Sequence, residues 1–425
     1  MWPSIAGASM LLGSMVARQT QRCTSAAGLK GGGRGKLLAW MAKARRRALE
    51  KENARVVTVA IGNEAGDLDS IVSPIACAYL IDKFGLPDGT RAHAVIPVIS
   101  FPRSQFRLRR DAETLFHKVF GEKAPLADLC FLDDAIHPAN LVLTDHNALT
   151  ITEESYANAP VLAILDHHTD SGDHREAQGT NRVVRDDVGS ACTIVTQALL
   201  KDPSAKIPEE LAFMLLAVIE LDCRRWNPSK TSPIDREIYA KLIEQLSLSW
   251  AELTSGIYEE LSEARRDVSG FSFADLLRLD YKNCSCIRSD APKVGMASIG
   301  ANFFDLSSSR GSEVDRMQEM RENMLSFAKE RGLDAIVALT APCNGQRHLM
   351  LTGESEQVVL DIVTLLQAPP SAFPKEISAL GILAKQGISE KGFAGKPVEA
   401  TGIKVLAIDA QISRKSIKPS IEAWI

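Results

Sequence analysis

Acidic and histidine side chains follow four short apolar runs in the first half of the chain. The segments that contain them are GNEAGDLDS (62–70), FLDDAIH (131–137), LTDHN (143–147) and ILDHHTD (164–170). If the runs are parallel strands, their carboxyl ends open on one crevice, and we expect the acids to converge there. Asp222 ends a further apolar segment, PEELAFMLLAVIELD (208–222). The pattern therefore predicts a cluster of carboxylates with imidazoles.

Such a cluster needs a compensating charge, because burial and neighbouring like charges both disfavour ionised carboxylates. Divalent cations supply that charge, and oxygen ligands with one or two imidazoles suit magnesium or manganese. Asp67 and Asp69 are two residues apart, so they can address two neighbouring ions. Two such metals form the clamp used for displacement at phosphorus.

Each of these residues also has an ordinary structural explanation. Asp69 or Asp145, taken alone, could cap a helix. The pair His167-His168 could be a loop feature, and acidic clusters are often solvated surfaces. The metal site is favoured by the joint arrangement, because helix caps do not need histidines beside them.

The elements that position these residues indicate an α/β fold. Continuous apolar runs such as RVVTVAIG (55–62) and VLAILD (161–166) are typical of parallel strands covered on both faces by helices. Helices are predicted at about 36–50 and 70–84, and a helical stretch follows over 188–266. A second set of strands is predicted at KVGMASIGA (293–301), LDAIVALTA (333–341), RHLMLTG (347–353) and GIKVLAID (402–409). We therefore expect an N-terminal extension over 1–35, a parallel-sheet domain over 36–268 and a smaller α/β domain over 269–425, with the active site between the two domains.

Composition narrows the class of protein. The 425 residues include 45% hydrophobic and 24% charged residues, which is typical of globular proteins. The net charge of −4 provides no general attraction to nucleic acid or to anionic lipid. No run reaches the roughly 18 apolar residues that a membrane span needs. We expect no nucleic-acid or membrane partner, and the oligomeric state is not readable from the sequence.

The N-terminus and the cysteines bear on location. The first 49 residues contain nine Lys or Arg and no acid, a bias typical of transit peptides. A disordered basic tail, or a start at Met41, would explain the same bias. The eight cysteines form no CxxC pair, which favours a reducing compartment and gives no indication of structural zinc. We expect a cytoplasmic protein, with mitochondrial targeting as the alternative.

The combined motifs resemble the DHH phosphoesterase superfamily. The resemblance rests on Asp166-His167-His168, on GNEAGDLDS and LTDHN before it, and on Asp222 after it. The segments LRLDYK (277–282) and SRK (413–415) are similar to motifs of the DHHA2 subgroup. That subgroup contains family II inorganic pyrophosphatases, exopolyphosphatases and prune-type proteins.

The resemblance implies a role for each matching residue. Asp67 would bind one metal, Asp69 the other, and Asp145 would bridge both. His167 and Asp222 would complete the second metal's ligands. His168 would contact the phosphate and protonate the leaving oxygen, and Asp166 would orient an imidazole.

Asn63 is a departure within this resemblance. Family II pyrophosphatases have a histidine at this ligand position, whereas exopolyphosphatase-like and prune-like members share GNE. An amide oxygen makes the first metal site harder, which favours magnesium over manganese. The departure also argues against a dedicated pyrophosphatase.

The substrate side of the resemblance consists of basic residues. It implies phosphate ligands at Lys282, Arg414 and Lys415, and a segment like FPRSQFRLRRD points to Arg103 and Arg107. The arginine-rich segment alone could also be a solvated helix face. The start of GSACT (189–193) could hold a phosphate at a helix N-terminus, or it could be an ordinary helix start.

These observations predict an exopolyphosphatase with two divalent cations, magnesium or alternatively manganese. It would remove terminal phosphate from inorganic polyphosphate by means of a hydroxide that the metals activate. The alternatives are a prune-like or short-chain phosphohydrolase acting on cyclic nucleotides, nucleoside tetraphosphates, tripolyphosphate or pyrophosphate, and an inactive scaffold. Nucleotide hydrolysis would need an aromatic side chain for base stacking, and Phe101 and Phe106 are the nearest ones.

Overall fold

The computed structural model describes most of the chain from residue 35 onward. The described residues are 35–49, 57–92, 94–121, 126–149, 151, 154–202, 205–284, 290–303, 306, 313–367 and 403–425. The basic extension expected over 1–35 lies outside them apart from its last residue, so the structure does not bear on it. None of the described helices is long and apolar enough to cross a membrane.

The first sheet has six parallel strands in the order β3-β2-β1-β4-β5-β6. Their bounds are Thr58–Ile61 (β1), Val95–Ile99 (β2), Cys130–Phe131 (β3), Asn140–Thr144 (β4), Val161–Asp166 (β5) and Arg182–Val184 (β6). β1 and β4 pair with each other at the centre of the sheet, and from this pair the strand order runs outward in opposite directions. Parallel sheets bind ligands at such a switch point.

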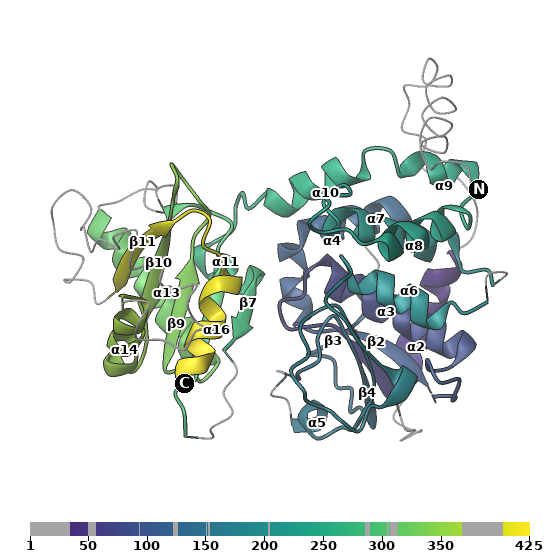
Figure 1. The fold of residues 1–425 in the computed structure, drawn as a ribbon, viewed down its shortest axis with the longest axis horizontal. Coiled ribbons are helices and arrows are strands. Elements are labelled where there is room, and N and C mark those ends of the chain that lie inside the picture. The colour runs from purple at the N-terminus through teal and green to yellow at the C-terminus, as the bar shows by residue number, and fades with distance from the viewer. Residues whose placement is uncertain are drawn as a thin grey trace, which may run out of the picture. The chain divides into compact units, whose positions relative to one another are not determined.

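Helices cover this sheet and extend beyond it (Figure 1). Their bounds are Lys36–Leu49 (α2), Leu68–Phe84 (α3), Arg110–Phe120 (α4), Glu154–Ala157 (α5), Ala191–Leu199 (α6), Glu209–Asp222 (α7), Pro233–Ile243 (α8), Leu248–Leu253 (α9) and Ile257–Arg266 (α10). Short 3-10 turns span Arg103–Leu108, Leu126–Asp128 and Gly179–Asn181.

The continuous apolar runs of the sequence are explained by burial on both faces of the first sheet. In β1 all four residues are buried. Ala60 packs into the cluster that contains the buried faces of α3, α6 and α7. Val59 and Ile61 pack into a separate cluster with α2 and α5 residues. Alternate residues of one strand thus serve two cores, as the pleat requires.

The second sheet has five strands in the order β11-β10-β9-β8-β7. Their bounds are Tyr281–Asn283 (β7), Val294–Ser298 (β8), Ala335–Leu339 (β9), Gln346–Thr352 (β10) and Lys404–Asp409 (β11). β8 and β9 are parallel, and the other neighbours are antiparallel. The four strands predicted from apolar runs are present. β7 was missed, because it is a short edge strand with only one buried residue.

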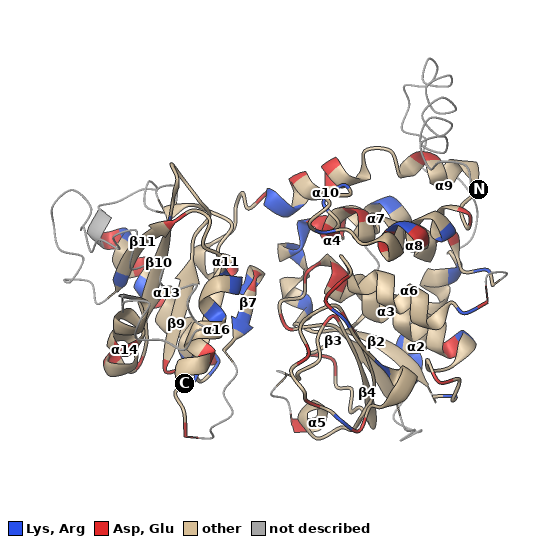
Figure 2. Cartoon of the chain, viewed as in Figure 1, with Lys and Arg blue, Asp and Glu red and all other residues tan. Residues whose placement is uncertain are grey.

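Two helix pairs cover the second sheet. Phe273–Leu279 (α11) and Glu313–Glu330 (α13) share one core with alternate residues of β8 and β9. Glu356–Gln367 (α14) and Arg414–Trp424 (α16) share another core with the remaining residues of these strands. Both sheets with their helices confirm the α/β class. Lys and Arg residues are visible on β7 and at the start of α16 in Figure 2.

Candidate metal and phosphate site

Of the four acidic segments predicted to converge, three do so, at the carboxyl ends of β1, β4 and β5, whereas Asp133 and Asp134 after β3 do not line the cavity. A cavity of about 570 Å³ is lined by Asp67, Asp69, Asp145, His167, His168 and Asp222. Asp67 caps α3, and its carboxylate accepts from the Ser70 amide at 3.1 Å. A helix cap was considered as an explanation for Asp69 or Asp145, but the residue that caps α3 is Asp67.

Asp145 lies at the centre of the cluster. It follows β4 directly and has a left-handed backbone, with φ of 61°. Its Oδ1 lies 3.1 Å from His167 Nε2 and 3.6 Å from His168 Nδ1. Its Oδ2 accepts from Ser70 Oγ at 2.5 Å and from Asn63 Nδ2 at 2.7 Å. Among the described residues, Asp145 and the two histidines can jointly hold a metal ion.

Asn63 supports Asp145 in this structure. Its amide nitrogen donates to the Asp145 carboxylate, and its oxygen accepts from the Ala65 amide at 2.9 Å. The oxygen expected to bind a metal is thus engaged with its own loop. Its role as a ligand remains a prediction.

Asp69 is held by the start of α6. Its carboxylate accepts from the Ala191 amide at 2.7 Å, the Cys192 amide at 3.1 Å and Ser190 Oγ at 3.1 Å. These amides were considered for phosphate, but they bind the protein's own carboxylate. The start of a helix favours an anion at this position, so α6 fixes Asp69 within the cluster.

The Asp222 carboxylate lies in an electrostatically unfavourable position, where a nearby cation would stabilise its charge. It ends α7, where the helix dipole disfavours negative charge. Its buried Oδ2 has no hydrogen-bond partner, and Oδ1 lies 3.9 Å from Arg265 Nη1. Arg265 also bonds Asp111 at 2.7 Å, so one guanidinium is shared by two carboxylates. An unpartnered buried carboxylate oxygen beside Asp69 fits a bound cation.

The pKa shifts of the carboxylates reflect the same excess of buried negative charge. Burial and the charge of Asp145 raise the pKa of Asp69 to about 6. Burial and Asp69 raise the pKa of Asp222 well above its ordinary value, and burial with Asp145 raises that of Asp67. Burial opposes ionisation of Asp145 too, but the His167 hydrogen bond and charge lower its pKa. The donor set therefore fits divalent cations.

The two histidines are oriented differently. Burial opposes protonation of His167, yet its bond to Asp145 raises its pKa to about 10. His168 Nδ1 lies 2.8 Å from Oδ1 of Asp166, a fully buried carboxylate that Asn147 Nδ2 also approaches at 2.5 Å. This contact leaves His168 Nε2 free of Asp166, on a side chain that is 36% exposed. This geometry fits the expectation that Asp166 orients an imidazole.

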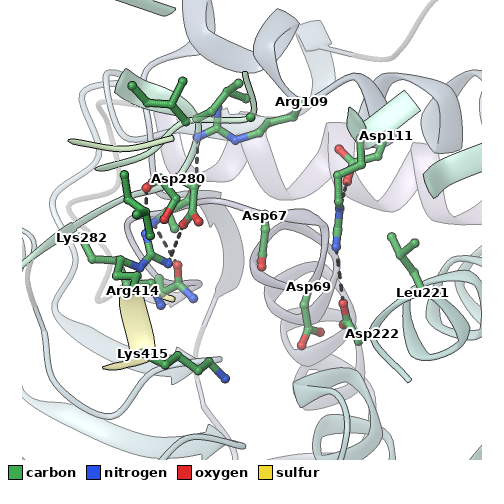
Figure 3. Close-up of a pocket in the computed structure, with 18 of the residues that line it drawn as sticks. Asp67, Asp69, Arg109, Asp111, Leu221, Asp222, Asp280, Lys282, Arg414 and Lys415 are labelled. Atoms are coloured by element: carbon green, nitrogen blue, oxygen red, sulfur yellow. Dashed lines mark hydrogen bonds and ion pairs between the residues drawn. The ribbon is translucent and has the colours of Figure 1, made fainter. Parts of the chain in front are cut away.

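Basic residues of β7 and of the start of α16 line the same cavity. Figure 3 shows Lys282, Arg414 and Lys415 on one side and Asp67, Asp69 and Asp222 on the other. Arg414 is fixed by Asp280, which it contacts through the carbonyl and the carboxylate, each at 2.7 Å. Burial and nearby cations lower the pKa of Lys415. The structure thus brings the three expected phosphate ligands to the acidic cluster.

Arg103 and Arg107 lie elsewhere. Arg103 Nη2 bonds Asp134 at 2.8 Å and the Leu129 carbonyl at 3.1 Å. Arg107 bonds Asp275 at 2.7 Å. Neither lines the cavity, whereas Arg109 and Arg110 do. Asp133 and Asp134 serve this peripheral network, since Asp133 accepts from the Arg103 amide at 3.0 Å.

Two positioning residues were not singled out from the sequence. Arg109 is 4% exposed and donates to the carbonyls of Ala65 and Gly66 at 2.7 and 2.8 Å, so it braces the loop before Asp67. Asp235 is fully buried and accepts from the Gly189 amide at 2.9 Å and Thr193 Oγ1 at 2.6 Å. It thereby holds the segment that binds Asp69. A capping pattern, Ser232 with Asp235, was the available signal.

The loop after Asp222 has an unusual backbone. Arg224, Arg225 and Trp226 have consecutive φ values of 46°, 56° and 66°. Left-handed conformation costs a non-glycine residue about 1–2 kcal/mol. Strain of this kind persists only where the surroundings enforce it, often at functional sites. Arg224 and Lys230 of this loop line the cavity.

Family models match both parts of the chain. The DHH family, N-terminal domain, matches residues 57–219, and the DHHA2 domain matches residues 259–424. Together the two matches cover more than half of the chain. The chain therefore contains a DHH-family N-terminal domain and a DHHA2 domain.

Individual relatives agree with this assignment. Exopolyphosphatase PRUNE1 of Mus musculus is 28% identical over 335 residues, which cover 75% of this chain and 68% of that protein. The match to human PRUNE1 spans 60% of that protein's length. A manganese-dependent inorganic pyrophosphatase of Methanocaldococcus jannaschii is 24% identical, over 66% of this chain and 81% of that protein.

The fold also agrees with a solved structure. A Methanococcus jannaschii protein assigned to the family II inorganic pyrophosphatases superposes with a TM-score of 0.52 at 19% identity. The superposition covers 86% of this chain and 98% of that one. At this identity the likeness shows the shared fold.

Proposed function

We propose that the chain is an exopolyphosphatase that releases terminal phosphate from inorganic polyphosphate. The observation that carries the proposal is one cavity with two opposite walls. Buried carboxylates, including the unpartnered oxygen of Asp222, face Lys282, Arg414 and Lys415. The relatives named exopolyphosphatase and inorganic pyrophosphatase support phosphoanhydride hydrolysis.

The acidic wall, which consists of Asp67, Asp69, Asp145 and Asp222, is proposed to hold two divalent cations. Asp67 with Asn63 would serve one ion, and Asp69, His167 and Asp222 the other, with Asp145 between them. Such cations, when bound, make water a stronger nucleophile and offset charge that develops on the phosphate. The oxygen-rich donor set favours magnesium, and manganese is the alternative.

The protein's own groups would position and protonate the phosphate. Lys282, Arg414 and Lys415 bind its oxygens by charge-assisted hydrogen bonds. His168, held at Nδ1 by Asp166, offers Nε2 to the leaving oxygen and donates the proton there. Closure of the DHHA2 part over the cavity would exclude water during turnover.

Polyphosphate is favoured over nucleotides by the lining of the cavity. Its described lining contains no Phe, Tyr or Trp side chain. Phe101 and Phe106, the candidates for base stacking, are 3% and 0% exposed and belong to the core. A nucleotide base would therefore lack an aromatic surface within this cavity.

The test is phosphate release with magnesium from four substrates in parallel: long-chain polyphosphate, tripolyphosphate, pyrophosphate and cyclic AMP. We expect release from long chains with pyrophosphate left over. Preference for pyrophosphate or cyclic AMP would overturn the substrate assignment. No release from any of the four, with divalent cations absent from the protein by calorimetry, would favour the inactive scaffold.

A further inference from the structure

We propose that Arg224 and Lys230 form a separate phosphate subsite that selects substrates with three or more phosphates. The inference rests on the proposed function, because it assigns a substrate length to the same cavity. Both residues belong to the loop that follows Asp222, and both line the cavity. They follow α7, in the part of the chain that contains the first sheet, whereas Lys282, Arg414 and Lys415 belong to the part that contains the second sheet.

The direction in which a polyanion leaves the site is set by charge. A second cavity of about 650 Å³ adjoins the first. The residues that line both cavities include Asp145, His167, His168, Lys282, Arg414 and Lys415. Among the other described residues that line the second cavity, Lys418 is the one cation, and the acids are Glu64, Asp166, Asp186 and Glu422. A chain of phosphates would be repelled there.

The first cavity offers cations beyond the shared ones. They are Arg109, Arg110, Arg224, Lys230, Arg265 and Arg347. Its extra acids include Asp67, Asp69 and Asp222, whose charges the proposed metals would offset. The phosphates behind the terminal one therefore lie in this cavity.

Three of these six cations already have partners, and a fourth, Arg347, belongs to β10 of the second sheet. Arg109 bonds backbone carbonyls, Arg110 pairs with Asp267, and Arg265 pairs with Asp111. Within the described part of the chain, the side chains of Arg224 and Lys230 form no hydrogen bond or ion pair. Both are exposed, and their positive charges contribute to the lowered pKa of Lys415 beside the effect of burial. Cations gathered without a carboxylate are suited to an anion from outside.

The loop presents its two cations on a fixed backbone. The Lys230 amide bonds the Asn227 carbonyl at 2.8 Å, and the Asn227 amide bonds the Cys223 carbonyl at 2.9 Å. Gly189 lies so close that a Cβ there would be 2.3 Å from the Lys230 carbonyl oxygen. This packing ties the loop to the segment that holds Asp69, so the backbone that carries the two cations is fixed relative to the acidic wall.

Substrate length follows from the number of cationic groups. The two phosphates of pyrophosphate are matched by the metals and by Lys282, Arg414 and Lys415. A third phosphate needs its own donors, and charged side chains supply the strongest hydrogen bonds to phosphate. Arg224 and Lys230 are placed to bind it.

The experiment compares Arg224→Ala, Lys230→Ala and the double variant with the wild type. Arg225→Ala is the matched control, because Arg225 lies in the same left-handed turn but pairs with Glu259 instead of lining the cavity. The readouts are KM and kcat for tripolyphosphate and long-chain polyphosphate, and the inhibition constant of pyrophosphate. Calorimetry of tripolyphosphate binding to metal-loaded protein gives an activity-independent measure.

We expect KM for tripolyphosphate and polyphosphate to rise about tenfold for each cation removed, with the pyrophosphate constant changed less than about threefold. The control should match the wild type. Equal losses for pyrophosphate, or no loss for any ligand, would overturn the subsite. If the wild type hydrolyses none of the ligands, the proposed function fails. A tripolyphosphate affinity that still depends on Arg224 and Lys230 would in that case support the subsite.

Discussion

The acidic wall (Asp67, Asp69, Asp145 and Asp222) and the basic wall (Lys282, Arg414 and Lys415) of the site are built in different ways. Asp69 and Asp145 are each 2% exposed and accept several hydrogen bonds from the first sheet and its helices. Lys415 is exposed, and Arg414 contacts only Asp280 among the interactions described above. Asp69 and Asp145 of the acidic wall are thus fixed before any ligand arrives, whereas the basic wall combines the half-buried Lys282 and Arg414 with the exposed Lys415 and has fewer protein partners.

The difference separates two kinds of mutational effect. Changes in the acidic wall alter a buried, charge-strained network, so they affect metal binding, stability and turnover together. Changes in the basic wall remove donors that have few protein partners, so they affect substrate affinity while leaving the fold intact. The predictions below test this division.

The largest effect is expected from Asp145→Asn. The amide removes the charge shared by both proposed ions and keeps only one of the two oxygens that His167 on one side and Asn63 and Ser70 on the other now contact. We expect kcat to fall roughly 10³-fold or more, with loss of bound metal measured by elemental analysis. Near-normal turnover with full metal content would contradict the central role of Asp145.

A second prediction concerns pH and metal. The raised pKa of His167, about 10, stabilises the metal-free fold below about pH 6.5. That contribution is lost as pH rises through the folded value. Asp69 acts in the same direction, because its raised pKa, about 6, makes the folded state bind more protons than the unfolded state. The metal-free protein should therefore lose stability as pH rises.

Metal binding should show the opposite trend, because cations compete with these protons. The increase in Tm on adding magnesium should be larger at pH 8 than at pH 5.5. Saturation at 100 times Kd corresponds to about 2.7 kcal/mol. Thermal melts at both pH values, with and without a chelator, measure the difference. An increase in Tm that is independent of pH would exclude proton competition at the cluster.

Asp235→Asn tests whether the acidic wall depends on residues outside the cavity. The neutral amide should weaken the bonds to Gly189 and Thr193, and so loosen the segment that holds Asp69. We expect metal affinity to fall about 10- to 100-fold, measured by calorimetry. Glu237→Gln on the same helix is the control, because Glu237 is exposed and pairs only with Lys241 in the described ion pairs. Equal affinities in the two variants would leave Asp235 a merely structural residue.

Lys415→Ala tests the basic wall. Removal of one phosphate donor should raise KM about tenfold. Tm should be unchanged within error, because the side chain is solvated. Kinetics and melts of the same preparation give both numbers. A large loss of Tm would show that the basic wall is structural as well.

The smallest effect is expected from Arg107→Ala. Its side chain is 57% exposed, and its pair with Asp275 is of the surface type, worth about 0–1 kcal/mol. We expect KM for polyphosphate to change less than about twofold. A tenfold increase would support the sequence-based assignment of Arg107 to the substrate and extend the basic wall to the 3-10 turn before α4.

Much of the fold could be predicted from the sequence. Apolar runs without alternation predicted the parallel strands, because burial on both faces leaves no polar positions in a short strand. β7 was not predicted, because an edge strand with one buried residue shows little hydrophobic pattern in the sequence. The convergence of the acids after β1, β4 and β5 followed from the rule that parallel strands open at one edge, but the same rule wrongly included Asp133 and Asp134 after β3.

The partners of individual side chains could not be predicted in this way. Arg103, Arg107, Arg109 and Arg110 form one basic segment in the sequence, yet only the last two line the cavity. The turn through Arg109 at φ of −103° and ψ of 70° ends one helix and begins the next, and so directs neighbouring arginines to different partners. Likewise, the amides of α6 could have bound phosphate until Asp69 was found against them.

By itself, the sequence determined the residue types at the site and the strands that deliver them. Carboxylates and imidazoles at strand ends imply metals, whatever the detailed packing. Only the tertiary structure decided which cations remain available for a ligand. Availability depends on contacts between segments far apart in the chain, such as Arg265 with Asp111 and Asp222, and these contacts leave no local pattern in the sequence.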